Sequence, residues 1–111
     1  MSVYVQPVGG AGFEIDADDL RKLKARFEVE WAFELFGYDE EGVIALPNGF
    51  EFCPFDGPNE EERVLIIADI GPALTNPALM PDWSIAQAWA KKWLIKFTED
   101  KPNLHIYQYS H

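Results

Sequence analysis

Three carboxylates in the segment FEVEWAFELF, residues 27–36, have a spacing that acid-base chemistry can use. Glu28, Glu30 and Glu34 alternate with large apolar residues. On one face of a strand, neighbouring side chains are roughly 6.5–7 Å apart, a separation that glycosidase carboxylates also show. Acids on the solvated face of a strand equally serve solubility and prevent edge-to-edge pairing of an apolar segment. Because nothing in the sequence indicates a sugar-binding cleft, the structural role is favoured.

A nucleophilic site would have to use Cys53, the one cysteine of the chain. Cys53, His105 and Asp69 can be written as a trio, but none of the sequence flanks that distinguish cysteine enzymes are present. A cysteine at the end of an apolar strand is typically a small buried hydrophobe. We therefore predict no catalytic residue and no enzyme. The alternative is a small enzyme or ligand-binding domain with a site near Asp69 and His105, because Asp69 is the ionisable side chain within the apolar run 64–70 and would need a partner if buried.

Metal and cofactor binding are not predicted either. Cys53, His105 and His111 do not stand at the short spacing of usual zinc or iron ligands. The glycine-rich run at 9–12 lacks the lysine and hydroxyl residue of a phosphate-binding loop and is followed by acidic residues. We expect no metal and no cofactor.

The acidic residues are concentrated in the middle of the chain. The formal net charge is −10, and residues 28–82 carry thirteen acids and one base, Arg63. A negative field repels phosphate backbones and anionic lipid, so direct nucleic-acid or membrane binding is disfavoured, and a basic protein partner would be attracted. The acids predicted to face that partner are Glu28, Glu30, Glu34, Asp39, Glu40, Glu41, Glu51, Glu60, Glu61 and Glu62.

Aromatic side chains supply the predicted anchors of such an interface. Trp83 follows a proline-rich segment, and Tyr107 and Tyr109 share one face of the last predicted strand. Buried aromatic anchors contribute most of the affinity in many interfaces. Trp89 and Trp93 are instead predicted to lie in the core, because they share a helical stripe with apolar neighbours.

The elements that must position these residues begin with a helix over 17–26. Asp16 is a suitable N-cap, acids occupy the first turn and bases the last. The segment 28–36 is then predicted as a strand, which places its large apolar residues on one face and its glutamates on the other. Continuation of the helix is the alternative, with apolar residues at steps of four.

The remaining pattern predicts an α+β fold with one domain over residues 1–111. A mostly antiparallel sheet in the order β-α-β-β-β-β-α-β would carry two helices on one face. Three prolines make residues 71–82 an irregular segment and a candidate contact surface. The predicted strands are 3–7, 28–36, 43–46, 50–55, 63–70 and 103–109, and the predicted helices are 17–26 and 84–98. Residues 43–46 and 50–55 are expected to form a hairpin around the turn PNG at 47–49.

These properties predict a small acidic protein-binding module that captures a basic site on a protein partner. The single cysteine, and the absence of a secretion signal or of an apolar run long enough for a membrane span, indicate a cytoplasmic protein. Inhibitors such as toxin-immunity proteins and phage anti-defence proteins are similar in size and charge, although no motif identifies such a family. An oligomeric structural or phage-particle component is a further alternative.

Overall fold

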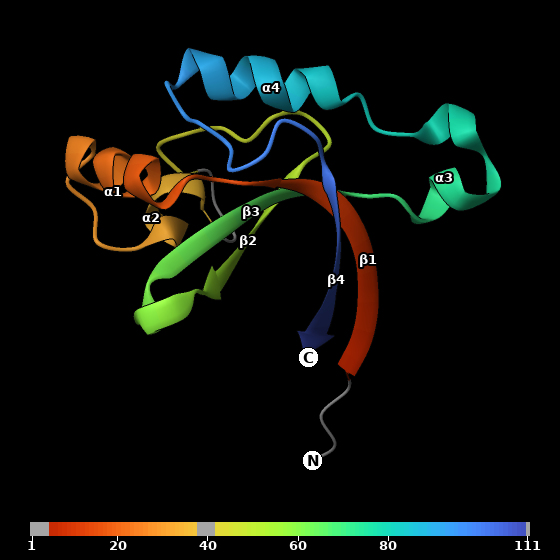
Figure 1. Ribbon diagram of the computed structural model, residues 1–111, viewed down its shortest axis with the longest axis horizontal. Coiled ribbons are helices and arrows are strands. Elements are labelled where there is room, and N and C mark those ends of the chain that lie inside the picture. The colour runs from red at the N-terminus through yellow and green to blue at the C-terminus, as the bar shows by residue number, and fades with distance from the viewer. Residues whose placement is uncertain (1–4, 38–41, 111) are drawn as a thin grey trace.

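The computed structural model describes residues 5–37 and 42–110, with side chains described for 10–37 and 42–103 (Figure 1). The helices are α1 (Ala17–Arg26), α2 (Ala32–Phe36), α3 (Gly71–Thr75) and α4 (Trp83–Lys92). The strands are β1 (Val5–Glu14), β2 (Glu51–Asp56), β3 (Glu62–Asp69) and β4 (Asn103–Ser110), and two short 3-10 turns are η1 (Pro58–Glu60) and η2 (Pro77–Leu79).

The four strands form one antiparallel sheet in the order β2-β3-β1-β4. In β3, the five residues 64–68 are all buried, as expected for a strand paired on both sides. Phe13 of β1 lies opposite Ile66 of β3 in this register. The predicted central strand at 63–70 and the predicted strands at 50–55 and 103–109 are therefore confirmed, each to within one residue at either end.

Helices α1, α2 and α4 cover one face of the sheet (Figure 1). Their apolar side chains and those of the strand residues on that face form one core cluster, whose fully buried members include Ile15, Leu20, Leu35, Ile44, Val64 and Ile66. Asp16 begins α1 as predicted, because its carboxylate accepts hydrogen bonds from the backbone N–H groups of Asp18 at 2.9 Å and Asp19 at 3.3 Å. The α+β class is confirmed, with two short helices, α2 and α3, that were not predicted.

The glycine-rich run lies inside a strand and does not end one. The first strand was predicted to cover residues 3–7 alone, but β1 continues through Pro7 and the glycine-rich run at 9–12 to Glu14. At Gly12 a Cβ atom would overlap the backbone carbonyl of Ile66 on the neighbouring strand. A glycine therefore permits a close approach of β1 and β3 at this position.

The predicted strand at 28–36 is wrong. After α1 the chain turns at Glu28, which has a left-handed φ of 56°, and then forms α2. The carboxylate of Glu34 accepts hydrogen bonds from the backbone N–H groups of Glu30 at 2.9 Å and Trp31 at 2.8 Å, which stabilises the start of this helix. The buried residues of α2 are Ala32, Leu35 and Phe36, at the spacing of one helix face.

The predicted strand at 43–46 and its hairpin are also wrong. Ile44 is fully buried and donates its N–H to the carbonyl of Leu35 at 2.9 Å, while the carbonyl of Ala45 accepts a 2.7 Å hydrogen bond from the indole of Trp89. These hydrogen bonds to α2 and α4 satisfy backbone groups that, in a strand, would pair with a neighbouring strand. The turn itself is present, with Gly49 at a φ of 84°, but it leads from a loop into β2.

Helix α4 is shorter than the predicted span of 84–98. It ends at Lys92, and Leu94 adopts a left-handed φ of 59°. Phe97 then pairs with Ile15 in an isolated β-bridge and stacks on Phe13, with ring centroids 4.5 Å apart. Phe97 thus continues the helical pattern in the sequence but packs against β1, whereas Leu94 is exposed. The segment 71–82, predicted as irregular, contains the short elements α3 and η2.

Candidate functional site

Residues 70–81 form a lobe that projects from the body of the molecule between β3 and α4 (Figure 1). The N–H of Gly71 donates a 2.8 Å hydrogen bond to the carboxylate of Asp69 at the start of α3. The side chain of Asn76 accepts a 3.2 Å hydrogen bond from the N–H of Ala78 at the start of η2. Local hydrogen bonds and prolines therefore give the lobe its shape.

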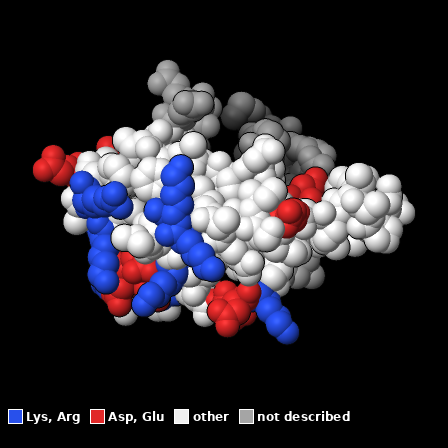
Figure 2. Space-filling view, turned by 90° about the horizontal axis from the view of Figure 1, so that it is seen from above, with Lys and Arg blue, Asp and Glu red and all other residues white. Residues whose placement is uncertain are grey.

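The surface of this lobe is apolar. Leu74 is 78% exposed, Leu79 56% and Met80 49%. No residue between Asp69 and Asp82 is charged, although a quarter of the whole chain is. In the space-filling view the lobe is the uncharged projection (Figure 2). A cluster of exposed large apolar side chains is unfavourable in water and is typical of a surface that another protein covers.

Trp83 joins the lobe to the core. Its ring makes edge contacts with Phe13, at a centroid distance of 6.3 Å, and with Phe50, at 5.9 Å. Such aromatic pairs contribute about 0.5–1.5 kcal/mol each beyond the area that they bury. The tryptophan that the sequence suggested as an exposed anchor is thus partly buried and positions the lobe. The most exposed apolar side chains of the lobe are those of Leu74 and Leu79, which the sequence analysis did not single out.

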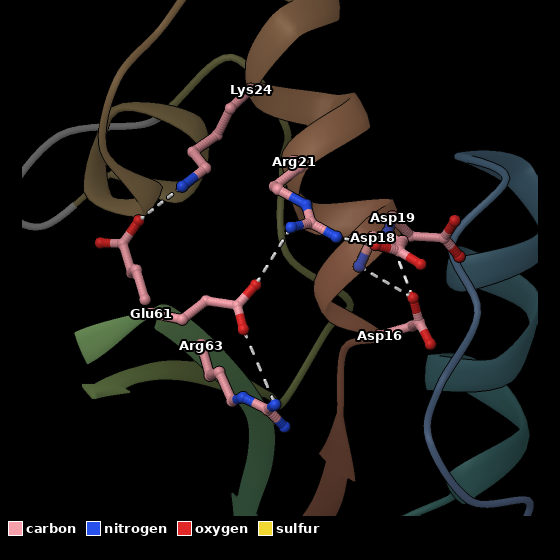
Figure 3. A network of polar contacts seen from close by, with 8 residues as sticks. Asp16, Asp18, Asp19, Arg21, Lys24, Glu61 and Arg63 are labelled. Atoms are coloured by element: carbon pink, nitrogen blue, oxygen red, sulfur yellow. Dashed lines mark hydrogen bonds and ion pairs between the residues drawn. The ribbon is translucent and has the colours of Figure 1, made fainter. Parts of the chain in front are cut away.

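Several acids predicted to face a partner make intramolecular contacts instead. Glu61 lies between two guanidinium groups, 3.6 Å from that of Arg21 and 3.8 Å from that of Arg63 (Figure 3). Glu62 contacts the ammonium group of Lys24 at 3.3 Å and accepts a 3.0 Å hydrogen bond from the N–H of Ala32. Together with Glu34, which caps α2, these acids stabilise the fold, so the single acidic strand face that the sequence suggested does not exist.

Four of the other predicted acids are exposed and form no ion pair within the described part of the chain: Glu28, Glu30, Glu51 and Glu60. They lie on separate elements, from the turn after α1 to η1. Asp39, Glu40 and Glu41 lie outside the described residues. Tyr107 and Tyr109 occupy β4 positions opposite Val8 and Gln6 of β1, and their side chains lie outside the described set. The acidic surface is therefore distributed over several elements.

The alternative site near Asp69 and His105 depends on how far apart the sheet places these two residues. Both residues pair with Gly10, one from each neighbouring strand. Two strand spacings, roughly 9.5 Å, therefore separate their backbones. The carboxylate of Asp69 accepts a hydrogen bond from the N–H of Gly71. Within the described ranges, no three His, Cys, Asp or Glu side chains are grouped so that they could hold a metal ion.

Cys53 lies on β2 and is partly buried. Burial raises the pKa of its thiol, so the thiol form is favoured at neutral pH. A reactive nucleophile requires the opposite shift, since the thiolate is the attacking species.

Comparison with known protein families, with curated proteins and with solved structures finds no match for this chain. Among residues 5–37 and 42–110, no helix is both long enough and apolar enough to cross a membrane.

Proposed function

We propose that this protein is a binding module whose apolar lobe, residues 70–81, inserts into a recess on a protein partner with a basic rim. The observation that carries the proposal is the exposure of Leu74, Leu79 and Met80 on an uncharged projection. Asp69 and Asp82 flank the lobe in the sequence, so a basic rim around the recess would complement them.

Charge supports the choice of a basic partner. The chain carries a net −10, and Glu28, Glu30, Glu51 and Glu60 are exposed without an ion pair in the described residues. Distributed acids of this kind act mainly on the association rate and on partner choice, while buried apolar anchors supply affinity. An inhibitor that covers a basic functional surface, of the toxin-immunity or anti-defence type, would combine these two properties.

The lobe is tested by exchanging its two leucines. Fully burying a leucine side chain contributes about 1.5–3 kcal/mol, so loss of both anchors in Leu74→Ser/Leu79→Ser is expected to weaken binding by about two orders of magnitude or more. The matched control is Val43→Ser, which removes an exposed apolar side chain outside the lobe. Tagged wild-type protein and both variants are used to capture partners from the source cells, and the affinity of a captured protein is then measured by calorimetry with purified components.

Three outcomes of these experiments distinguish the proposal from its alternatives. Loss of a captured protein with the lobe variant but not with Val43→Ser supports the proposal, and weakening of that complex by salt supports the basic rim. Equal capture by all three proteins contradicts it. If the lobe instead binds a second copy of the chain, sedimentation gives a mass well above 12.6 kDa for the wild type and a monomer for the lobe variant, and the oligomeric alternative replaces the proposal.

A further inference from the structure

The C-terminal ends of α1 and α4 meet at a second surface. Phe27 directly follows α1 and Trp93 directly follows α4. Their rings are in contact, with centroids 6.1 Å apart. A cation from the last turn of each helix lies over the adjacent ring, Arg26 at 5.4 Å from the centroid of Phe27 and Lys92 at 5.8 Å from that of Trp93. The cationic groups are thus held next to an aromatic pair.

Leu94 has an unfavourable conformation at this surface. Its φ is 59°, and its side chain is 80% exposed. The N–H of Leu94 bonds to the carbonyl of Lys91 at 3.2 Å and that of Ile95 to the carbonyl of Ala90 at 2.8 Å, so the helix ends in a Schellman motif, in which glycine usually occupies the left-handed position. The left-handed conformation costs an L-residue about 1–2 kcal/mol. Little burial compensates for this strain, so Leu94 is placed where stability alone would favour glycine.

A hollow of about 150 Å³ lies beside Leu94, lined by Asp19, Lys22, Leu23, Arg26, Trp93 and Leu94. The carboxylate of Asp19 is buried and accepts a 2.6 Å hydrogen bond from the N–H of Lys96. The cations Lys22 and Arg26 form no ion pair with any described residue. The hollow therefore combines apolar walls with a cationic rim, and its one acid is engaged by the backbone.

We infer that this hollow binds an acidic segment of a second protein partner and takes up one aliphatic side chain of that segment. The volume suits a group of about the size of benzene or an aliphatic side chain. Acidic residues on both sides of that side chain would meet Lys22 and Arg26. Lysine and arginine side chains gather on the part of the helical face away from the uncharged lobe (Figure 2), so this site and the lobe can bind different partners.

The probe for this site is the peptide Ac-EDLDE-NH2, titrated into the full chain labelled with 15N. The backbone amides of residues 22–26 and 93–95 are expected to shift saturably, and the affinity to fall several-fold when salt is raised from 50 to 300 mM. Two control peptides separate the contributions: Ac-EDSDE-NH2 lacks the aliphatic side chain, and Ac-KRLRK-NH2 reverses the charge. Both are expected to bind at least fivefold more weakly.

Variants of the chain test the same residues. Lys22→Glu/Arg26→Glu is expected to weaken binding of Ac-EDLDE-NH2 at least tenfold. The charge-matched control Lys91→Glu/Lys101→Glu alters two cations that do not line the hollow and should change affinity less than twofold. Leu94→Gly is expected to raise the denaturation midpoint relative to Leu94→Ala, because glycine relieves the left-handed strain, and to weaken binding about threefold relative to wild type.

Absence of saturable shifts at these amides with millimolar peptide overturns the inference, as does equal binding of Ac-EDSDE-NH2. If a single-stranded DNA oligonucleotide shifts the same amides and displaces the peptide, the site binds polyanions in general and the proposed acidic partner is wrong. These readouts do not involve the lobe, so they are independent of the test of Leu74 and Leu79.

Discussion

Substitution of Glu62 tests directly what stabilises the packing of α1 and α2 beside β3. Its carboxylate accepts a 3.0 Å hydrogen bond from the N–H of Ala32, the first residue of α2, and lies 3.3 Å from the ammonium group of Lys24 on α1. Both charged side chains are only 19% exposed. The sequence analysis assigned Glu62 to partner binding, whereas these contacts predict that it fixes two helices to β3.

The expected loss of stability follows from the two contacts. A hydrogen bond to a charged group contributes about 1.5–3 kcal/mol. A partly exposed ion pair adds about 0.5 kcal/mol. Glu62→Ala is therefore expected to lower the free energy of unfolding by about 2–3.5 kcal/mol. Glu62→Gln keeps an acceptor oxygen for Ala32 but removes the charge, so this variant should lower the free energy of unfolding by about 1 kcal/mol.

Urea denaturation followed by tryptophan fluorescence measures these differences, and Lys24→Ala is the control that removes the ion pair alone. In a double-mutant cycle, the coupling between Lys24 and Glu62 should be about 0.5 kcal/mol, well below the total effect of Glu62→Ala. A loss below 0.5 kcal/mol for Glu62→Ala would refute the conclusion that this carboxylate stabilises α2.

Three further predictions concern the sheet and its neighbours. Gly12→Ala introduces a Cβ that overlaps the carbonyl of Ile66, so it should cost about 2 kcal/mol or more of unfolding free energy, and an unchanged urea midpoint would contradict the close approach of the strands. Burial raises the pKa of Cys53, so the rate of its alkylation by iodoacetamide should rise at a higher pH in the folded chain than in the urea-unfolded chain. If the pH midpoint of alkylation in the folded chain lies at or below that of the unfolded chain, the thiol is activated and the prediction is wrong. Trp89→Phe removes the indole donor to Ala45 and is expected to cost about 1 kcal/mol by thermal unfolding, with Trp93→Phe, whose indole forms no hydrogen bond within the described chain, as the comparison.

The sequence predicted those elements whose determinants are local. Helix α1 has its N-cap, charged ends and apolar stripe within residues 16–26, and the structure confirms it. The continuous apolar run before Asp69 predicted a buried central strand, and β3 is that strand. The three prolines of segment 71–82 also predicted an irregular segment and a candidate contact surface, and its role in contacts stays a prediction.

The strand predicted at 28–36 failed because its alternating pattern also allows other structures. Residues 32, 35 and 36 share one face of a helix, and which face is buried depends on what lies opposite. Here Glu62, thirty residues away, supplies an acceptor for the first N–H of α2, and the N–H of Ile44 bonds to the carbonyl of Leu35 in the same helix. Neither contact can be recognised from the local pattern of residues 28–36.

The sequence by itself thus determined the α+β class, the helix α1, the three strands β2, β3 and β4, and the strong excess of acids over bases. The tertiary structure decided which charges are available, because ion pairs between distant residues engage Glu61 and Glu62, while Lys22 and Arg26 form none with the residues that the structure describes. It also decided which apolar side chains are exposed, since Trp83 packs against the core and Leu74 does not. Exposure depends on what the rest of the chain covers, and that is a property of the whole fold.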